Sequence, residues 1–337
     1  MPLSVPLCGR ERYPYNLLTF MKRITFQKAM SIVVAELRTN GRWGTAHIYQ
    51  ATANSFLAFL NSSELLLCRL TPALLKAYEI HLRRQGRRWN TVSTYMRTLR
   101  ALYNKGVDRR WVPAVPRLFE HIYTGTRVES KRAIPAFDMN RLLKEAEANN
   151  HLSNFTQGEQ VACRIFCLMF LLRGIPFVDL IHLRKEDYAG GVITYLRRKT
   201  GRLLTVAVSP EAQKLLDGFR LSDASSPYLL PFIRRVGGDE QAYREYQLAL
   251  RKLNGYLKQL ARQLGLTSAL SSYAARHTWA TMAYYCEIHP GIISEAMGHS
   301  SITVTETYLK PFHEKRIDAA NRQVISYVRC QGRQAHV

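Results

Sequence analysis

Hydrophobic residues recur at helical spacing through the first third of the chain and predict four short helices there. The first helix is expected to begin after Thr25, a residue type that caps helix N-termini, and to end near Asn40. The second is expected after Thr45 and the third after Thr71, where Pro72 suits the first helical turn. The inward faces of the first two helices would carry Phe26, Met30, Val33 and Leu37, and then Ile48, Phe56, Phe59 and Leu60.

A basic cluster lies between the third and fourth of these helices. The fourth helix is expected to begin at Asn90. Almost no acidic residues are interspersed among the arginines, so a plain solvated surface is a weaker explanation for them than contact with a polyanion. The candidate contacts in the cluster and on the fourth helix are Arg83, Arg84, Arg87, Arg88, Arg97 and Arg100.

A second, mainly helical domain is expected after the proline-containing and polar segment 113–132. One stretch of it breaks the helical pattern. The runs 192–196 and 203–208 are rich in β-formers and flank a glycine-containing turn, which predicts a β-hairpin. An apolar stripe at 246, 250, 253, 257, 260 and 264 then predicts a helix that ends at Gly265. The expected fold class is therefore mainly α with a small β-hairpin or sheet, an α+β chain.

Composition narrows the class of partner. The chain has 337 residues, of which 47% are hydrophobic, so it is long enough for two domains with their own cores. Lys and Arg total 48 against 25 Asp and Glu, for a net charge of +23. Residues 1–132 alone hold 22 basic and 7 acidic residues. A positive density of this size favours a nucleic acid, because each Lys or Arg placed on a phosphate releases a counterion.

Other features argue against a membrane or metal protein. The longest apolar run, Ile165–Leu172, is far shorter than the roughly 20 residues that cross a bilayer. The N-terminus lacks the apolar core of a signal peptide, so a cytoplasmic location is expected. The six cysteines form no CxxC pair, and Cys163 and Cys167 are expected as buried free thiols. We therefore expect no metal and no cofactor.

Three short segments near the C-terminus carry the chemistry. They are the stretch 271–281, which contains Arg276 in Arg-His-Thr-Trp-Ala-Thr, the Gly-His-Ser of 298–300 around His299, and Thr305-Glu-Thr-Tyr308. Each is weak alone, but in this order and spacing they resemble the catalytic domain of the tyrosine recombinase (phage integrase) family. The amino-acid sequences of these segments are most similar to those of recombinases of Bacteroidetes mobile elements and DNA inversions.

The resemblance implies a division of the chain. Residues 1–24 would be an N-terminal extension, 25–112 a SAM-like helical core-binding domain and 113–132 a linker. Residues 133–330 would be the catalytic domain, followed by a tail at 331–337. The two domains would form a clamp around the DNA duplex.

The resemblance also implies roles for individual side chains. Tyr308 would attack a DNA phosphodiester and form a 3′-phosphotyrosyl bond, with Arg276 and His299 neutralising the phosphate oxygens. Arginine suits that task because its planar fork can grip two oxygens. Lys199, at the tip of the predicted hairpin, would protonate the departing 5′ oxygen. Its neighbours Arg197, Arg198 and Arg202 are candidate phosphate contacts, and Lys199 could also be an ordinary turn lysine.

Two positions depart from the family pattern. The usual histidine three residues before the second arginine is Tyr273, which can donate a hydrogen bond but cannot easily carry protons at pH 7. Packing is the alternative for Tyr273. If Asp179 and Gly174 are matched to the family's acid and glycine, Pro176 falls where the first arginine belongs.

Arg173 lies close to one helical turn before Pro176 and could replace the missing arginine. Asp179 would then orient the basic side chains of the site without itself contacting the substrate. The alternative is that Arg173 and Asp179 form a structural ion pair and that Arg202 or another residue of the hairpin takes the place of the missing arginine. His277 follows Arg276 directly, so it is expected to point elsewhere, into the core or behind the site.

These features favour a DNA strand-exchange enzyme that acts as a homotetramer on two double-stranded recombination sites, with DNA-bending proteins as possible accessories. Integration, excision and inversion of a DNA segment all fit the sequence. The expected place of action is the bacterial cytoplasm, at the nucleoid. Two alternatives remain open: a helical DNA-binding regulator without chemistry, and an enzyme like type IB topoisomerases. The segment 314–328, with Ile317, Val324, Ile325 and Val328 at helical spacing, is expected to dock on a neighbouring subunit or, alternatively, in cis.

Overall fold

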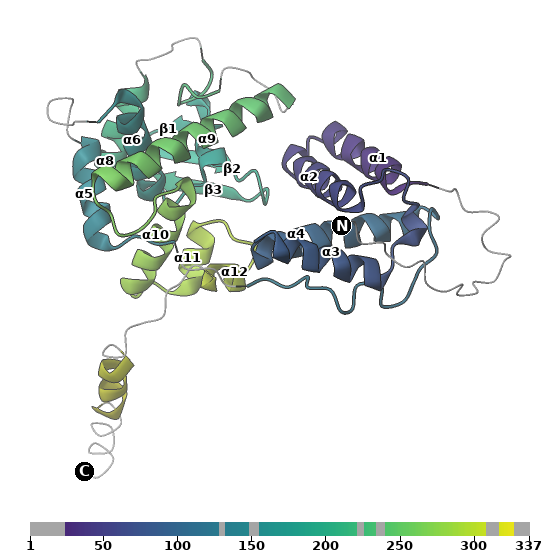
Figure 1. The fold of residues 1–337 in the computed structure, drawn as a ribbon. Helices are drawn as coiled ribbons and strands as arrows, with labels where there is room; N and C mark the ends of the chain where they lie inside the picture. Colours follow the sequence, from purple (N-terminus) through teal and green to yellow (C-terminus); the bar gives the residue numbers. More distant parts are fainter. Residues whose placement is uncertain are drawn as a thin grey trace. The chain divides into compact units, whose positions relative to one another are not determined.

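The computed structural model describes residues 24–127, 132–147, 155–220, 226–233, 240–307 and 317–326. The chain divides into two compact units, 1–127 and 128–337, each with its own hydrophobic core. Most described residues are helical, and the strands form one small sheet (Figure 1). The mainly α class with a small sheet, predicted from the sequence, is confirmed.

The first unit is built from α1 (Phe26–Thr39), α2 (Trp43–Leu60), α3 (Pro72–Arg84) and α4 (Trp89–Asp108), with a short 3₁₀ turn at Leu67–Arg69. Thr25 and Thr71 cap α1 and α3 as predicted, each accepting a hydrogen bond from a backbone N–H of the first turn. The rings of Phe26 and Phe56 meet edge to face at 4.9 Å in the centre of the core.

Two expectations for α2 are wrong. The helix begins at Trp43 rather than after Thr45, and its N-cap, Arg42, makes no side-chain capping hydrogen bond. Ile48 is exposed, although the sequence pattern placed it inward. With no cap residue to fix it, the start of α2 is set by packing of Ala46, Tyr49 and Phe56 against the rest of the unit.

The segment that follows α4 continues the first unit. Leu118 and Ile122 are buried in its core, and the Tyr123 backbone N–H donates to the buried Glu79 carboxylate at 2.7 Å. Asn90 and Arg127 are joined twice, because the Asn90 side chain donates to the Arg127 carbonyl and accepts from the Arg127 N–H. Packing with the first unit therefore extends well past residue 112, where the sequence suggested that the linker begins.

The second unit is organised around α6 (Gln157–Leu171), a helix that is buried on nearly every side from 165 to 169. Thr156 and Glu159 form a capping box at its start. Four helices pack against α6 (Figure 1). They are α5 (Ala136–Glu147), α8 (Pro210–Arg220), α9 (Glu240–Gln263) and α10 (Ser272–Tyr285).

The sheet has the order β1-β2-β3 and is antiparallel throughout. Its strands are β1 (Tyr188–Ala189), β2 (Val192–Leu196) and β3 (Leu203–Ala207). The predicted hairpin is confirmed by β2 and β3, with Val192 opposite Ala207 and Leu196 opposite Leu203. Ile193 and Tyr195 face the core, whereas Thr194 and Leu196, which alternate with them, are exposed.

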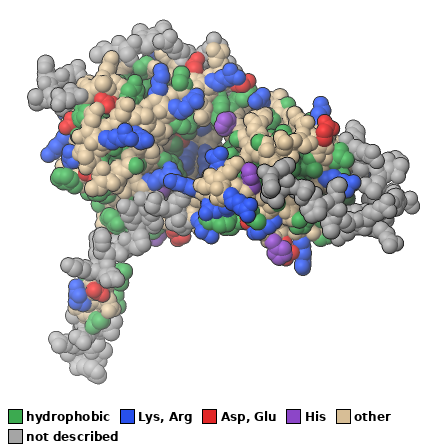
Figure 2. All heavy atoms as spheres, in the orientation of Figure 1, with side chains coloured by type: hydrophobic (Ala, Val, Ile, Leu, Met, Phe, Trp, Pro, Cys, Tyr) green, Lys and Arg blue, Asp and Glu red, His purple; other side chains and the backbone are tan. Residues whose placement is uncertain are grey.

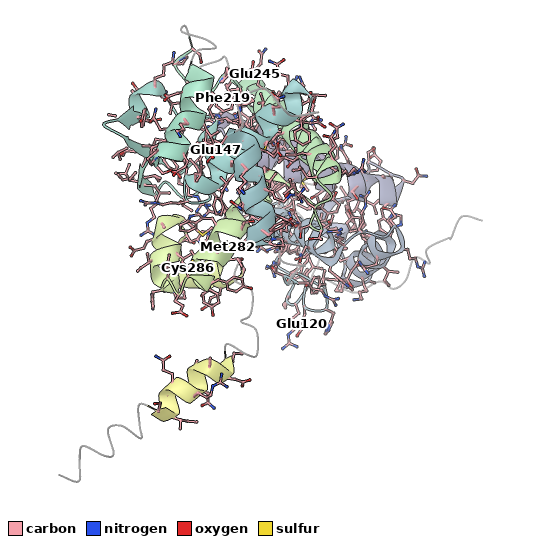
Figure 3. All side chains as sticks on the ribbon, turned by 90° about the vertical axis from the view of Figure 1, so that its left-hand side faces the viewer. Glu120, Glu147, Phe219, Glu245, Met282 and Cys286 are labelled. Carbon is pink, nitrogen blue, oxygen red and sulfur yellow. The ribbon has the colours of Figure 1, made fainter. Side chains whose placement is uncertain are left out.

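The remaining elements are short. They are α7 (Phe177–Leu180), a 3₁₀ turn at Lys185–Asp187, α11 (Pro290–Ala296), α12 (Ile302–Glu306) and a helix at 317–326. Cys163 and Cys167 are buried free thiols, as predicted, whereas the free Cys286 is exposed at the end of α10 (Figure 3). None of the helices in the described ranges is long and apolar enough to span a membrane.

Candidate active site

Arg276 is the centre of the candidate site. It projects from the second turn of α10 and is only 2% exposed, which makes it one of the largest fully buried side chains among the described residues. Its Nη1 donates to the carbonyl oxygen of Gly174 at 2.8 Å, and its Nη2 to that of Met297 at 2.7 Å. Nη2 also lies 2.7 Å from Nε2 of His299. A permanently charged guanidinium is thus held at the meeting point of three chain segments.

Gly174 is required where it stands. Its φ of +69° lies in the left-handed region, and an added Cβ would come within 3.0 Å of the Arg276 Cα. The turn after α6 can therefore approach α10 closely enough for the Gly174 carbonyl to reach the guanidinium.

His299 lies in the turn between α11 and α12 and is buried. Gly298, directly before it, has a φ of +65°, and a Cβ there would meet the Leu204 side chain at 2.9 Å. The other ring nitrogen of His299, Nδ1, lies 2.8 Å from the Thr305 hydroxyl. Burial lowers the pKa of His299 to about 3, and the positive charges of Arg276, Arg197 and Lys199 add to that effect. The ring is therefore neutral at physiological pH.

Both ring nitrogens of His299 face protein groups in this structure. Arg276 is likewise turned toward backbone carbonyls and is hardly accessible to solvent. The predicted role of His299, a hydrogen-bond donor to a phosphate, would therefore require this Arg276–His299 contact to change when DNA binds.

The tip of the β2–β3 hairpin is fastened to the same turn. Arg197 Nη1 donates to the carbonyls of Met297, at 2.9 Å, and Gly298. On the other side of the tip, Arg202 Nη1 donates to the His299 carbonyl at 2.9 Å. Lys199 lies between these two anchors, with its side chain exposed and its charge close enough to act on His299. The structure thus brings Arg276, His299 and the Lys199 hairpin together.

The structure corrects the sequence-based assignment of Arg197. It was predicted to contact phosphate, but its side chain is only 6% exposed and its donors point to backbone carbonyls. Its Nε lies 3.8 Å from Oδ2 of Asp179, which is itself buried. Arg197 is a structural brace between hairpin, turn and α7. Arg198 and Lys199 remain on the surface, and Arg202 is exposed apart from its bond to His299.

Asp179 lies behind the hairpin rather than beside Arg173. Its Oδ1 accepts a hydrogen bond from the Arg198 backbone N–H at 3.0 Å, and Arg197 is its ion-pair partner. Burial raises the pKa of the Asp179 carboxyl, while the Arg198 N–H and the charges of Arg197, Arg276 and Arg198 work in the opposite direction. The alternative of an ion pair between Arg173 and Asp179 is wrong for this structure.

Arg173 is half-buried. Its backbone is left-handed, with φ of +58°, and its Nη1 donates to the Thr205 carbonyl on β3 at 3.1 Å. The positive charges of Arg276 and Arg173 both lie close enough to the buried Tyr195 to lower its pKa, against the larger effect of burial, which raises it. Pro176 is the N-cap of α7 and offers no side-chain donor.

Tyr273 and His277 form a separate pair on α10. Their rings meet edge to face at 4.8 Å, Tyr273 is 43% exposed, and the Arg132 guanidinium lies 5.9 Å from the Tyr273 ring. An exposed tyrosine side chain on the first turn of α10 is compatible with the predicted phosphate contact. Tyr308 lies outside the described residues.

The first unit carries a basic surface. Arg83, Arg84, Arg87, Arg88, Arg97 and Arg100 are all exposed. Sequence reasoning missed that two guanidinium groups lie over the Trp89 ring, that of Arg83 at 4.5 Å and that of Arg127 at 4.6 Å from its centre. Figure 2 shows Lys and Arg side chains spread over the visible face and fewer Asp and Glu side chains.

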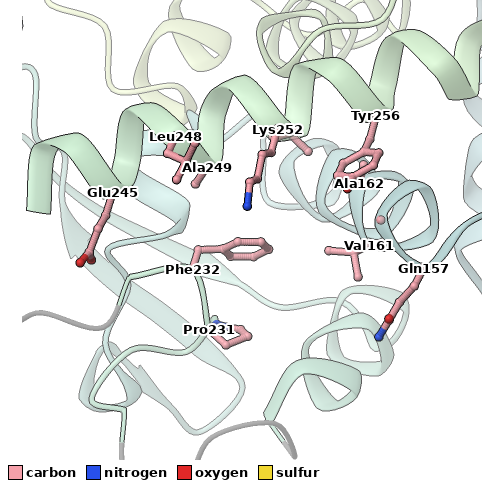
Figure 4. Close-up of a pocket in the computed structure, with 12 residues that line it drawn as sticks. Gln157, Val161, Ala162, Pro231, Phe232, Glu245, Leu248, Ala249, Lys252 and Tyr256 are labelled. Atoms are coloured by element: carbon pink, nitrogen blue, oxygen red, sulfur yellow. The ribbon is translucent and has the colours of Figure 1, made fainter.

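A groove of about 470 Å³ lies away from this site, between α6 and α9 (Figure 4). Val161 of α6, Phe232 of the loop after α8, and Lys252 and Tyr256 of α9 line it. None of the predicted site residues belongs to its lining.

Two family models match the chain. A phage integrase SAM-like domain model matches residues 25–122, and the phage integrase family model matches residues 133–315. The second model alone covers more than half of the chain. The protein belongs to the phage integrase family of tyrosine recombinases.

Individual members of this family are also similar to the chain. Tyrosine recombinase XerA from Pyrococcus furiosus is 24% identical over 155 residues, which are 45% of this chain and 51% of the relative. The chain thus spans about half the length of this curated relative. The integrase of transposon Tn1549 has the same fold with a TM-score of 0.61 at 14% identity, covering 89% of this chain and 99% of that one. A lambda integrase dimer gives a TM-score of 0.57 at 14% identity, with 89% and 81% covered.

Proposed function

We propose that the protein is a site-specific DNA recombinase that cuts and rejoins DNA strands through a 3′-phosphotyrosyl intermediate. The Tyr308 hydroxyl would release its proton to solvent, and its oxygen would bond to phosphorus as the bond from phosphorus to the 5′ oxygen breaks. Lys199 would give a proton to that 5′ oxygen. The phosphodiester energy stays in the tyrosyl link, so the proposal requires no nucleotide cofactor.

One observation carries the proposal: Arg276, His299 and the hairpin that bears Lys199 are joined by hydrogen bonds into a single site. Positioning and charge neutralisation are the main requirements of phosphoryl transfer. A protein that only binds DNA has no need for a buried arginine–histidine pair beside a lysine-bearing hairpin.

The closed state of the site suggests how DNA would enter it. Arg276 donates hydrogen bonds to the Gly174 and Met297 carbonyls in this structure. A bound phosphate would replace these carbonyls as the acceptor. Phosphate oxygens are stronger acceptors than carbonyls because they carry charge. We infer that DNA binding opens this contact and that Arg173 and Tyr273 supply further contacts from the neighbouring turn and helix.

Double-stranded DNA is the proposed substrate. The relatives with known structures include the Tn1549 integrase in complex with a circular-intermediate DNA and XerH bound to its difH substrate, the latter with a TM-score of 0.57 at 16% identity. The exposed arginines of the first unit and the Arg83–Trp89–Arg127 stack would contact the DNA backbone. We propose accordingly that the protein acts in the cytoplasm, at the nucleoid. Repeats flanking the gene are the first target sites to test, and their orientation would separate inversion from integration or excision.

Assembly into a tetramer on two sites is also proposed. The helix at 317–326 has its apolar residues Ile317, Val324 and Ile325 exposed, and the rest of the predicted 314–328 segment lies outside the described residues. Docking on a neighbouring subunit would bury these side chains. Truncation after Lys315 should leave binding to a single site intact and abolish pairing of two sites in native gels. Undiminished pairing would show that this helix does not couple the subunits. Accessory DNA-bending proteins remain an additional proposal.

The decisive experiment uses nicked suicide substrates built from the flanking repeats. The wild type should form a covalent protein–DNA product, and Tyr308→Phe should bind the same DNA without forming it. Specific binding with no covalent product from the wild type would favour the alternative of a DNA-binding regulator. Relaxation of supercoiled DNA lacking the repeats would favour a topoisomerase-like enzyme.

A further inference from the structure

Arg202 is the last residue of the hairpin turn, directly before β3. Its side chain is exposed apart from one hydrogen bond, in which Nη1 donates to the main-chain carbonyl of His299 at 2.9 Å. The guanidinium therefore contacts the turn that carries His299, although the sequence marks Arg202 as a candidate phosphate contact. Lys199, the proposed proton donor, lies three residues earlier in the same hairpin turn.

The hairpin turn 197–202 is closed by its own main chain. The Arg197 N–H donates to the Arg202 carbonyl at 2.9 Å, and the Gly201 N–H donates to the Arg197 carbonyl at 2.7 Å. Gly201 has a φ of +67°, in the left-handed region that glycine adopts readily. The side chains of Arg197 and Arg202 fasten both ends of this turn to residues 297–299. Lys199 is thus carried on a short turn that is held at each end.

The Arg202 bond does not depend on the closed contact between Arg276 and His299. It uses the main-chain carbonyl of His299 and involves neither the imidazole nor the Arg276 guanidinium. When DNA draws that guanidinium onto a phosphate, the Met297 carbonyl keeps its second donor, Arg197. The anchored turn can therefore stay in place during the opening that the proposed function requires.

Electrostatic repulsion gives such an anchor a purpose. The turn 197–202 carries four cationic side chains and no acidic one. The positive charges of Arg276, Arg197 and Lys199 all lie close enough to His299 to add to the effect of burial, which depresses its pKa. Like charges at such short range repel one another until a phosphate neutralises them. Without a bond to residues 297–299, this repulsion would favour positions of Lys199 farther from Arg276.

We propose that Arg202 is a positioning residue for Lys199 in the cleavage step, a role that rests on the function proposed above. Its bond to the His299 carbonyl keeps the hairpin turn beside the residues that would hold the phosphate. The Lys199 ammonium then reaches the 5′ oxygen as the bond from phosphorus to that oxygen breaks. In the absence of the bond DNA would still bind, but Lys199 would deliver its proton in a smaller fraction of the complexes.

A direct contact of Arg202 with the phosphate is the competing explanation, and the leaving group separates the two. In a substrate whose 5′ bridging oxygen is replaced by sulfur, the P–S bond breaks and the sulfur leaves as a thiolate. A thiol is a far stronger acid than an alcohol, so this thiolate needs no proton from Lys199. Loss of proton delivery therefore slows cleavage of the oxygen substrate only, whereas loss of a phosphate contact slows cleavage of both substrates.

The first test is single-turnover cleavage of both substrates by the full-length protein at saturating concentration. Lys199→Ala should cleave the oxygen substrate roughly 10²–10⁴-fold more slowly than the wild type and should recover on the sulfur substrate. Arg202→Met keeps much of the side-chain length and removes the donors, so it should be roughly 10- to 100-fold slower on the oxygen substrate and should also recover on sulfur. Arg202→Lys keeps a donor and should lose less than Arg202→Met.

Arg198→Met is the matched control, because it removes the same charge from an exposed side chain of the same turn. Its DNA binding should be weaker, but the ratio of its rates on the sulfur and oxygen substrates should equal that of the wild type. Equal slowing of Arg202→Met on both substrates, or no slowing on the oxygen substrate, would overturn the proposal. A failure of sulfur to restore cleavage by Lys199→Ala would also overturn it, since Lys199 would then not be the proton donor.

Hydrogen exchange tests the anchor without DNA and without activity. The Arg197 and Gly201 amides, which donate within the hairpin turn, should exchange faster in Arg202→Met than in the wild type or in Arg198→Met. The rest of the second unit should exchange at wild-type rates, which shows that the variant is folded. Unchanged exchange in the turn would overturn the proposal. A wild type that forms no Tyr308-dependent adduct would instead refute the proposed function itself, and with it the role of Arg202 in cleavage, whatever the exchange shows.

Discussion

Arg197 offers a direct test of how the site is built. In Arg197→Met the side chain keeps much of its length but loses the two hydrogen bonds to the Met297 and Gly298 carbonyls and the ion pair with Asp179. Asp179 is 3% exposed, so its carboxylate would remain as a buried charge without that partner. Removing one member of a buried ion pair costs about 3–5 kcal/mol. For a unit of this size the melting temperature should fall by roughly 6–20 °C.

The pH dependence of this loss follows from the shifted pKa of Asp179. Burial already raises that pKa, and deleting Arg197 removes one of the charges that lower it. In the variant, Asp179 therefore holds its proton to higher pH when folded than when unfolded, so stability falls as pH rises above the unfolded pKa of about 3.9. The destabilisation should be larger at pH 8 than at pH 5.

Urea unfolding of the full-length protein measures the effect, with Arg198→Met as the control because the Arg198 side chain is exposed. Arg197→Met should lose several kcal/mol of unfolding free energy, and Arg198→Met should lose almost none. Adding Asp179→Asn to Arg197→Met should recover part of the loss, since it removes the stranded charge. A loss of unfolding free energy below about 1 kcal/mol in Arg197→Met would be within the usual range for surface changes. Such a small loss, together with weakened DNA binding, would refute the structural role of Arg197 and support its predicted contact with phosphate.

Three further predictions concern Arg173, the salt dependence of DNA binding and the pH dependence of stability caused by His299. Arg173→Gly suits the left-handed backbone at this position, so it should be at least as stable as Arg173→Ala while cleaving DNA about 10²–10³-fold more slowly than the wild type; normal cleavage would leave Arg173 a structural role only. DNA affinity in filter binding should fall roughly 10³–10⁵-fold between 50 and 200 mM salt if about 6–10 phosphates are contacted, and a flat profile would contradict DNA as the partner of the basic surface. Unfolded His299 takes up a proton near pH 6.5 but folded His299 only near pH 3, so acidification through this window should cost up to about 1.4 kcal/mol per pH unit. His299→Gln should show a shallower pH dependence of unfolding, and equal slopes would argue against the depressed pKa.

Local signals in the sequence were sufficient for many elements. The caps at Thr25 and Thr71 act within one helical turn, and the alternation in β2 and β3 is a property of each strand, so both could be predicted. The start of α2 could not, because no capping side chain marks it.

The candidate site was only partly visible in the sequence. The segments around Arg276 and His299 are recognisable from their amino-acid sequences, but the inward position of Arg197 was not predicted. A signal for it existed: Arg197 continues the period of two that places Ile193 and Tyr195 inside. The contact of Arg127 with the Trp89 ring joins residues far apart in the sequence. The Thr305–His299 contact joins residues only six apart, but it depends on the conformation of the turn before α12, which no periodic pattern encodes.

The central claim is that Tyr308 becomes covalently attached to DNA, and peptide mapping of the trapped adduct tests it most directly. The wild-type protein would be reacted with a nicked suicide substrate, digested with protease and nuclease, and analysed by mass spectrometry. The account predicts a single modified peptide that contains Tyr308, with its phenolic oxygen joined to a 3′-phosphate. Attachment at any other residue, or a 5′-phosphate linkage at Tyr308, would contradict it.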